Sequence, residues 1–168
     1  MTDVTAAPAG LQHDLGWTLG VVFRAYLKSA TAVTVGLPGG HRGYQVLAAA
    51  ARSAPASQSA LAQQLGIDRT VMTYLLDDLE RTELVERRPA PTDRRTRHVV
   101  ATTRGRGLLD DLAARLAQAE AHVLAGLPDS DQQTFKALLQ RLAGYANDLD
   151  PVSDACAIVQ DINAATSP

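Results

Sequence analysis

The chain has 168 residues, a formal net charge of −2 and an aromatic content of 4%. Its length fits one domain with helical extensions, and its many alanines and leucines favour a mainly α fold. The single cysteine, Cys156, excludes an internal disulfide, and no run reaches the roughly 18–20 apolar residues that a membrane span needs. The first ten residues lack the basic and apolar regions of a secretion signal, so we expect a cytoplasmic protein with no membrane partner.

The first third of the chain predicts a polar arm followed by two helices. Residues 1–11 are small and polar and are expected to be disordered. A helix is predicted over residues 12–35, the glycines and proline of 36–40 break the chain, and a second helix over 42–53 stops before Pro55. The apolar positions of the first helix follow the 3.6-residue period: Leu15, Leu19, Val22, Phe23, Tyr26 and Leu27.

Two short helices separated by a tight turn come next. Ser57 can cap a helix over residues 58–65, and Gly66 supplies the left-handed conformation that often ends a helix. Asp68 can then cap a second helix over 69–82. An apolar face is predicted for Val71, Met72, Leu75, Leu76 and Leu79. The opposite face carries Arg69, Thr70, Thr73, Tyr74 and Asp77. Such a pair is typical of a helix-turn-helix.

A β-hairpin and two long helices complete the prediction. Strands are expected at residues 84–88 and 98–102, joined by a proline-containing loop, which together make a wing. A helix over 104–127 has its apolar positions at Leu108, Leu112, Leu116, Val123 and Leu127. Ser130 can cap a helix over 131–148 with its stripe at Phe135, Leu138, Leu139, Leu142, Tyr145 and Leu149. For the tail, 150–168, two alternatives stay open: a short docking helix or a disordered extension.

Charge is unevenly distributed along the chain. The segment from Arg81 to Arg106 holds eight arginines and three acidic residues, a net charge of +5. Residues 107–168 hold three basic and nine acidic residues, a net charge of −6. A local basic segment on a mildly acidic body is typical of a protein that meets phosphate along one edge.

The helix pair and the wing both carry side chains suited to reading duplex DNA. An α-helix fits the major groove, where short polar groups and arginine distinguish base edges. The candidate residues on the helix pair are Ser57, Gln58, Arg69, Thr70, Thr73 and Tyr74. The candidate residues on the wing are Arg88, Asp93, Arg94, Arg95 and Arg97. A narrow minor groove attracts inserted arginine, and Asp93 can orient a neighbouring guanidinium group.

On these residues the chain resembles the MarR family of bacterial and archaeal regulators. Residues 57–67 resemble its first helix segment, 68–80 its recognition helix and 84–87 its first wing strand. The wing signature follows in order: Asp93, Arg94, Arg95, Val99, Thr102 and Gly105. The chain departs from the pattern at Glu83, where glycine is usual and the turn into the wing can be strained, and at Ala101, where leucine is usual. The resemblance covers residues 12–149 and is specific over 57–105.

The resemblance implies the domain organisation and the assembly. A winged helix-turn-helix occupies residues 41–103, and helices at 12–35 and 104–149 form a dimerisation region. The long apolar stripes support this independently, since one small winged helix cannot bury them. We expect a homodimer that binds double-stranded DNA at a pseudo-palindrome, with its two recognition helices about 34 Å apart. It is expected to regulate transcription, with repression favoured over activation.

The resemblance also implies a small-molecule effector bound between the two regions. Candidate ligand residues are Trp17, Arg24, His41 and Tyr44, although each also suits a core or interface position. We expect no cofactor and no metal, because the four histidines are scattered, and no oxidant sensing, because Cys156 lies in the tail. Two alternatives are disfavoured. A winged helix used only for protein contacts would not need wing arginines, and an enzyme would need an activated nucleophile or a metal set, which the sequence does not show.

Overall fold

The computed structural model describes residues 10–11, 13–90 and 96–148. The helices are α1 (Leu15–Val33), α2 (Gly40–Arg52), α3 (Gln58–Gln64), α4 (Arg69–Arg81), α5 (Thr103–Leu124) and α6 (Asp129–Asp148). The strands are β1 (Ala56–Ser57), β2 (Val85–Pro89) and β3 (Arg97–Ala101). Most of the predicted arm, Asp93, Arg94 and Arg95 of the wing, and the tail with Cys156 lie outside the described residues. The chain divides into two compact units between Val123 and Leu124.

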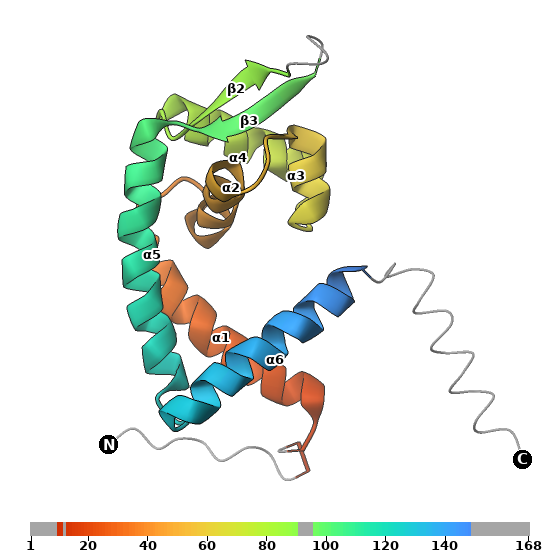
Figure 1. The fold of residues 1–168 in the computed structure, drawn as a ribbon, viewed down its shortest axis with the longest axis vertical. Coiled ribbons are helices and arrows are strands. Elements are labelled where there is room, and N and C mark those ends of the chain that lie inside the picture. The colour runs from red at the N-terminus through yellow and green to blue at the C-terminus, as the bar shows by residue number, and fades with distance from the viewer. Residues whose placement is uncertain (1–9, 12, 91–95, 149–168) are drawn as a thin grey trace, which may run out of the picture. The chain divides into compact units, whose positions relative to one another are not determined.

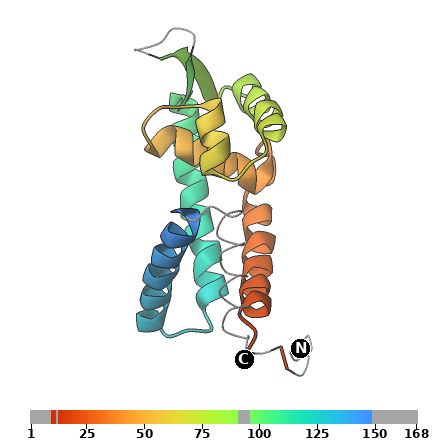
Figure 2. The same cartoon turned by 90° about the vertical axis from the view of Figure 1, so that its right-hand side faces the viewer.

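The mainly α prediction with a small antiparallel sheet is confirmed, and the fold is a winged helix. In the first unit the wing strands and the α3–α4 pair lie together at one end, and α1 and α5 extend away from them (Figures 1 and 2). Strands β2 and β3 pair in antiparallel register from Val85 opposite Ala101 to Pro89 opposite Arg97. The hairpin predicted from the sequence therefore forms, one residue later in β2 and one residue earlier in β3 than expected.

A third strand, β1, was not predicted. Its two residues pair with β3, Ala56 opposite Val99 and Ser57 opposite His98, which gives the order β1-β3-β2. Ser57 has φ −70° and ψ 159° and also caps α3, accepting a hydrogen bond from the Ala60 N–H at 3.2 Å. The extended backbone that a cap residue needs is also the backbone of a strand, so one residue can serve both elements. A two-residue strand has no periodicity for a sequence to show.

The hydrophobic core lies between α2, α3, α4, the sheet and the first half of α5. Side chains that are essentially inaccessible come from each of these elements: Val46, Leu47, Leu61, Met72, Leu76, Leu79, Val85, Val99 and Leu109. One predicted member is wrong, because Val71 is 42% exposed. On α5 the buried apolar stripe is Leu109, Leu112 and Leu116, and the predicted Leu108 is only partly buried beside it.

Helix ends follow local hydrogen bonding. The α1 helix begins three residues later than predicted, because Asp14 caps it by accepting from the Trp17 N–H at 2.6 Å. The predicted cap at Ser130 is wrong: α6 already begins at Asp129, and the Pro128 carbonyl accepts from the Gln132 N–H at 3.0 Å. Ser130 therefore lies inside the first turn of α6, flanked by Asp129 and Asp131, whose negative charges suit a helix N-terminus.

Helices α3 and α4 each end in the same turn motif. After α3, Gly66 has φ 60° and the Ile67 N–H returns to the Ala62 carbonyl at 2.9 Å. After α4, Glu83 has φ 60° and the Leu84 N–H returns to the Leu79 carbonyl, also at 2.9 Å. This left-handed helix ending favours glycine, because a Cβ there crowds the backbone. Glu83 is the single non-glycine residue with positive φ among the described residues, so the sequence's departure at this position carries backbone strain.

Immediately after this turn, three elements meet at the backbone of Leu84. The Leu84 carbonyl accepts from the Thr102 N–H at 3.1 Å, and the Thr102 hydroxyl donates to the Glu83 carbonyl at 2.6 Å. The same hydroxyl accepts from the Gly105 N–H at 3.0 Å and so caps α5. A Cβ on Gly105 would lie 2.0 Å from the Leu84 oxygen, which no side chain can tolerate. Glycine is therefore required where α5 crosses the start of β2.

Glu83→Gly should stabilise the folded protein by about 1 kcal/mol, because glycine adopts the left-handed conformation without a Cβ penalty. The ion pair that is lost, Arg104 to Glu83 at 3.4 Å, is largely exposed and contributes little. Urea unfolding at one fixed protein concentration measures the change. Glu83→Ala is the control, since it loses the same ion pair and keeps the Cβ. Equal stability of the glycine and alanine variants would contradict the strain.

Candidate nucleic-acid interface

The N-terminus of α4 is held by a single carboxylate. Asp68 accepts hydrogen bonds from the backbone N–H groups of Thr70 at 2.8 Å and Val71 at 3.1 Å. The bonds from Val71 and Thr70 lower the pKa of Asp68, because they favour its charged form. The predicted caps Ser57 and Asp68 are thus both confirmed, and together they fix where α3 and α4 begin.

Five of the predicted DNA-contacting residues line one groove. Ser57 and Gln58 come from the start of α3, Arg69 and Thr73 from α4, and Arg97 from the start of β3. The groove encloses about 480 Å³ and is completed by Ser59, Ala62 and Thr96. Positions 40 residues apart in sequence therefore meet on one face, because β3 pairs with β1 directly before α3.

Two further predicted residues lie on the same helix outside this groove. Thr70 is exposed on the first turn of α4, and Tyr74 is exposed one turn later with 69% of its surface accessible. A tyrosine ring so exposed, on a helix whose opposite face is buried, contributes little to the core of the described residues. The Tyr74 ring is exposed toward a partner that approaches the N-terminal half of α4, whereas the Thr70 side chain also hydrogen-bonds to the Asp68 carboxylate.

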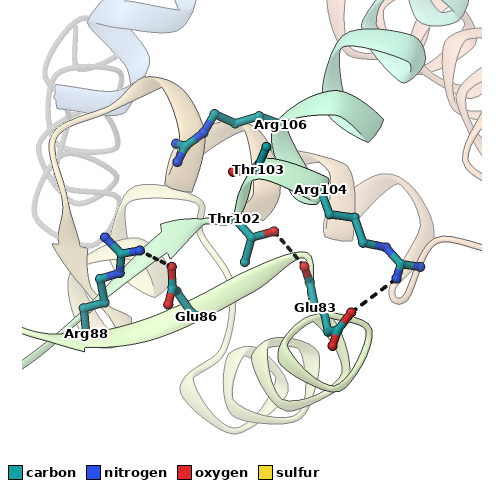
Figure 3. Close-up of a pocket in the computed structure, with 7 residues that line it drawn as sticks. All are labelled: Glu83, Glu86, Arg88, Thr102, Thr103, Arg104 and Arg106. Atoms are coloured by element: carbon teal, nitrogen blue, oxygen red, sulfur yellow. Dashed lines mark hydrogen bonds and ion pairs between the residues drawn. The ribbon is translucent and has the colours of Figure 1, made fainter.

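Arg88 lies in a different place from the other candidates. It lines a second depression together with Glu83, Glu86, Thr102, Thr103, Arg104 and Arg106 (Figure 3). There its guanidinium group is paired with Glu86 at 2.5 Å, and Arg104 is paired with Glu83 (Figure 3). Arg88 and Arg87 lie on opposite faces of β2, because side chains alternate along a strand. Glu86 shares the face of Arg88, and Val85 shares the face of Arg87.

The basic segment is less free than its composition suggests. Arg81 pairs with Asp78 at 2.8 Å, and Arg87 pairs with both Asp77 and Glu80. Burial alone would lower the pKa of Arg87, but its hydrogen bonds to Asp77 and Glu80 outweigh burial and raise it. Within residues 96–148 and 13–90, Arg97 and Arg106 make no ion pair. The wing-tip arginines Arg94 and Arg95, with Asp93, lie outside the described residues.

Sequence reasoning missed Arg87 as an organiser of this site. It counted Arg87 only as one more positive charge, whereas the side chain is 20% exposed and bound to α4 and α3. A signal was available: Arg87 lies two residues after the buried Val85, so strand alternation turns it inward beside two acids of α4.

The predicted ligand residues separate into a cluster and two outliers. His41 at the start of α2 packs edge-on against Tyr26 of α1 at 5.4 Å and stacks on Tyr44 at 6.2 Å between ring centroids. Burial lowers the pKa of His41, and its Nδ1 atom is buried without a hydrogen-bond partner in the described part of the chain. Burial, Glu120 and Tyr44 raise the pKa of Tyr26. Trp17 is half-buried and Arg24 exposed on α1, and no ring contact joins them to this cluster.

The part of the chain that the structure describes contains no group of three or more histidine, cysteine, aspartate or glutamate side chains able to hold a metal ion. No helix among the described residues is long and apolar enough to cross a membrane.

Comparisons with known proteins identify the family. Residues 37–96 match the model of the MarR family. A protein of Thauera aromatica described as a transcriptional regulatory protein for the hcr operon is 30% identical over 120 residues, which cover 71% of this chain and 70% of that protein. CouR from Rhodococcus jostii RHA1, solved with p-coumaroyl-CoA, is 31% identical with a TM-score of 0.68, over 81% of this chain and 96% of CouR.

A MarR family protein of Mycobacterium tuberculosis, solved in complex with DNA, is 27% identical with a TM-score of 0.66. The match covers 81% of this chain and 98% of that protein. Family model, sequence identity and fold agree with the geometry of the α3–α4 pair and the wing. This chain belongs to the MarR family of winged-helix, DNA-binding transcriptional regulators.

Proposed function

We propose that this regulator is a homodimeric repressor that binds a pseudo-palindromic operator and releases it when a small molecule binds. It acts by binding alone, without catalysing a reaction, and works in the cytoplasm. The observation that carries the proposal is the groove that brings Gln58, Arg69, Thr73 and Arg97 onto one face. The Mycobacterium tuberculosis relative, which was solved in complex with DNA, supports DNA as the partner of this chain.

In this proposal α4 enters the major groove and reads bases. Arg69 and Thr70 occupy its first turn and Tyr74 its second, all exposed, while Met72, Leu75 and Leu76 anchor the opposite face in the core. A helix held rigidly from behind presents its polar face at a defined depth, which is what base-edge recognition needs. The free backbone N–H groups at the start of α3, next to Ser57 and Gln58, would meet a phosphate.

The wing is proposed to contact the neighbouring minor groove. Arg97 stands at the beginning of β3, exposed and on the groove that Arg69 also lines. Arg94 and Arg95 precede it in sequence and are proposed to extend the same contact, with Asp93 orienting them. Arg88, paired with Glu86 in the other depression, is proposed only as a phosphate contact at the margin.

Dimerisation is proposed from unpaired apolar surface on two helices, each considered by itself. On α1, Leu15 is 69% exposed and Phe23 is 57% exposed, and only Ala30 of the whole helix is buried. On α6, which has no buried residue among those described, Leu142 is 52% and Tyr145 66% exposed. Stripes of this size at helical spacing favour burial against a second copy. They support residues 12–35 and 104–149 as the dimerisation region.

An effector site is proposed at the aromatic cluster of Tyr26, His41 and Tyr44. Two phenol rings and an imidazole offer stacking surface, and the His41 Nδ1 atom, which has no hydrogen-bond partner among the described residues, offers one hydrogen-bonding position. That combination suits a small molecule with an aromatic or conjugated part. The p-coumaroyl-CoA bound to CouR is such a molecule, and Trp17 and Arg24 of α1 are proposed to lie at the edge of the same site.

Binding to random-sequence duplex should weaken steeply as salt rises, because each neutralised phosphate releases counterions.

Arg97→Met should cost about 1–3 kcal/mol of binding free energy for the sequence selected from a random duplex pool. Arg52→Met, which removes an exposed arginine at the end of α2 outside both depressions, is the matched control and should cost nothing measurable. Salt-independent binding would exclude the DNA interface and favour a protein-contact module.

The same selection tests the dimer, since half-sites should lie about one DNA turn apart. Leu138→Glu with Leu142→Glu should give monomers in light scattering at micromolar concentration, because two buried carboxylates would be unpaired at the interface. Gln140→Glu, on the opposite side of α6, should leave the dimer intact. A wild-type protein that is monomeric at all concentrations would contradict the assembly.

His41 should make stability depend on pH. Its folded pKa lies below the unfolded value of about 6.5, so the unfolded chain binds the proton more tightly. Stability is then fully present above pH 6.5 and falls as pH drops toward the folded pKa. His41→Gln should reduce this loss between pH 7.5 and 5.5 in urea unfolding, because it removes the titrating imidazole. Equal pH profiles for wild type and His41→Gln would exclude a buried neutral histidine.

A further inference from the structure

Arg87 occupies the contact between the wing and the recognition helix. It lies on β2, and its backbone N–H donates to the Glu80 carboxylate of α4 at 3.1 Å. Its guanidinium group also pairs with Glu80, and with Asp77 one turn earlier at 2.6 Å. With 20% of its side chain exposed, Arg87 is the least accessible arginine in the ion pairs of the described residues. Its single positive charge is shared by two carboxylates of α4 and offsets half of their negative charge.

A chain of hydrogen bonds runs from Arg87 to the groove. Its Nη2 atom donates to Gln58 Oε1 at 3.4 Å, and Gln58 Nε2 donates to Thr73 Oγ1 at 2.6 Å. The Thr73 hydroxyl donates in turn to the Arg69 carbonyl at 2.9 Å. The chain joins β2, α3 and α4 through side chains that line the groove at its Gln58 and Thr73 end.

Arg87 determines which groups donate and which accept in this series of hydrogen bonds. An arginine has five donors and no acceptor, so it holds the oxygen side of the Gln58 amide. The nitrogen side must then face Thr73, whose hydroxyl accepts from Gln58 and gives its own hydrogen to Arg69. Thr73 takes one of the two hydrogens on Gln58 Nε2, and no acceptor for the other is found in the part of the chain that the structure describes. The groove therefore presents an amide donor, whereas an amide turned by 180° would present an acceptor.

We propose that Arg87 is a positioning residue that fixes the Gln58 amide as a hydrogen-bond donor toward DNA, without itself touching DNA. The inference rests on the proposed function of the groove and goes beyond it by assigning the chemistry of one contact. A phosphate oxygen or a base acceptor would match this donor. A direct phosphate contact by Arg87 is disfavoured, because it would break two ion pairs and leave Asp77 and Glu80 unneutralised beside DNA.

The test compares two duplexes: the sequence selected from a random pool by the wild-type protein, and a random-sequence duplex. The ratio of their dissociation constants measures discrimination, and the slope of log affinity against log salt counts phosphate contacts. Arg87→Met should lower discrimination by about tenfold and leave the slope unchanged. Arg81→Met is the matched control, since it removes an arginine from an ion pair with Asp78 on the same helix at a 75%-exposed position. It should change neither quantity.

A double-mutant cycle shows whether Arg87 acts through Gln58. In a Gln58→Ala background, Arg87→Met should lower discrimination by less than about twofold, because the amide it positions is absent. Circular dichroism checks that each variant is folded. If Arg87→Met does not fold, Arg87→Lys keeps an ion pair with α4 but lacks the fork that also reaches Gln58, and should lower discrimination at least about threefold.

Each outcome decides the role. A salt slope that falls by about 0.9 in Arg87→Met identifies a phosphate contact and overturns the proposal. Full loss in the Gln58→Ala background, or wild-type discrimination by Arg87→Lys, overturns it as well. If the wild-type protein binds neither duplex in a salt-dependent way, the DNA interface itself is wrong and the role of Arg87 falls with it.

Discussion

The close approach of α5 to the Leu84 carbonyl fixes the arrangement of the winged helix. Leu84 is the residue at which the recognition helix has ended and the wing is about to begin, and Gly105 crosses it with no room for a Cβ. The Thr102 hydroxyl closes the junction, donating to Glu83 and accepting from Gly105. Because three elements share one backbone position, neither the wing nor α4 can shift alone. The strain at Glu83 is tolerated there, since the surrounding hydrogen bonds determine its conformation.

At the start of α3, one residue has three structural roles. Ser57 pairs as a strand residue with His98, caps α3 and borders the groove. This short pairing brings Arg97 beside Arg69, although the two are separated by a helix and a hairpin in sequence. The groove is therefore a product of sheet register. A one-residue slip of β3 would move Arg97 to the opposite face and leave the groove without its wing cation.

Features coded by neighbouring residues could be predicted, and features coded by distant ones could not. Ser57, Gly66 and Asp68 act within four residues of themselves, so their capping and turning roles are readable from the sequence. Four of the six candidates on the helix pair, Ser57, Gln58, Arg69 and Thr73, line the groove, whereas Thr70 and Tyr74 lie outside it, so their role as DNA contacts stays a prediction. The β1 strand pairs with residues far along the chain and, at two residues, is too short to show a period. Strand alternation indicates that Arg87 points inward, but its partners Glu80, Asp77 and Gln58 depend on how the chain folds back on itself. Val71 was predicted on the apolar face of its helix but is 42% exposed, because apolar character alone does not say which residues at the edge of such a face are covered.

The α5 helix runs unbroken from Thr103 to Leu124, a length of about 33 Å at 1.5 Å per residue. Because its first turn is packed against Leu84, α5 acts as a stiff rod whose N-terminal end is attached to the wing and the recognition helix. A tilt of about 10° applied at the far end corresponds to a displacement of about 6 Å over this length. Two recognition helices matched to successive major grooves tolerate little mismatch over their separation of about 34 Å. The absence of a methyl group at Gly105 thus determines how faithfully a small movement far from DNA reaches the surface that binds it.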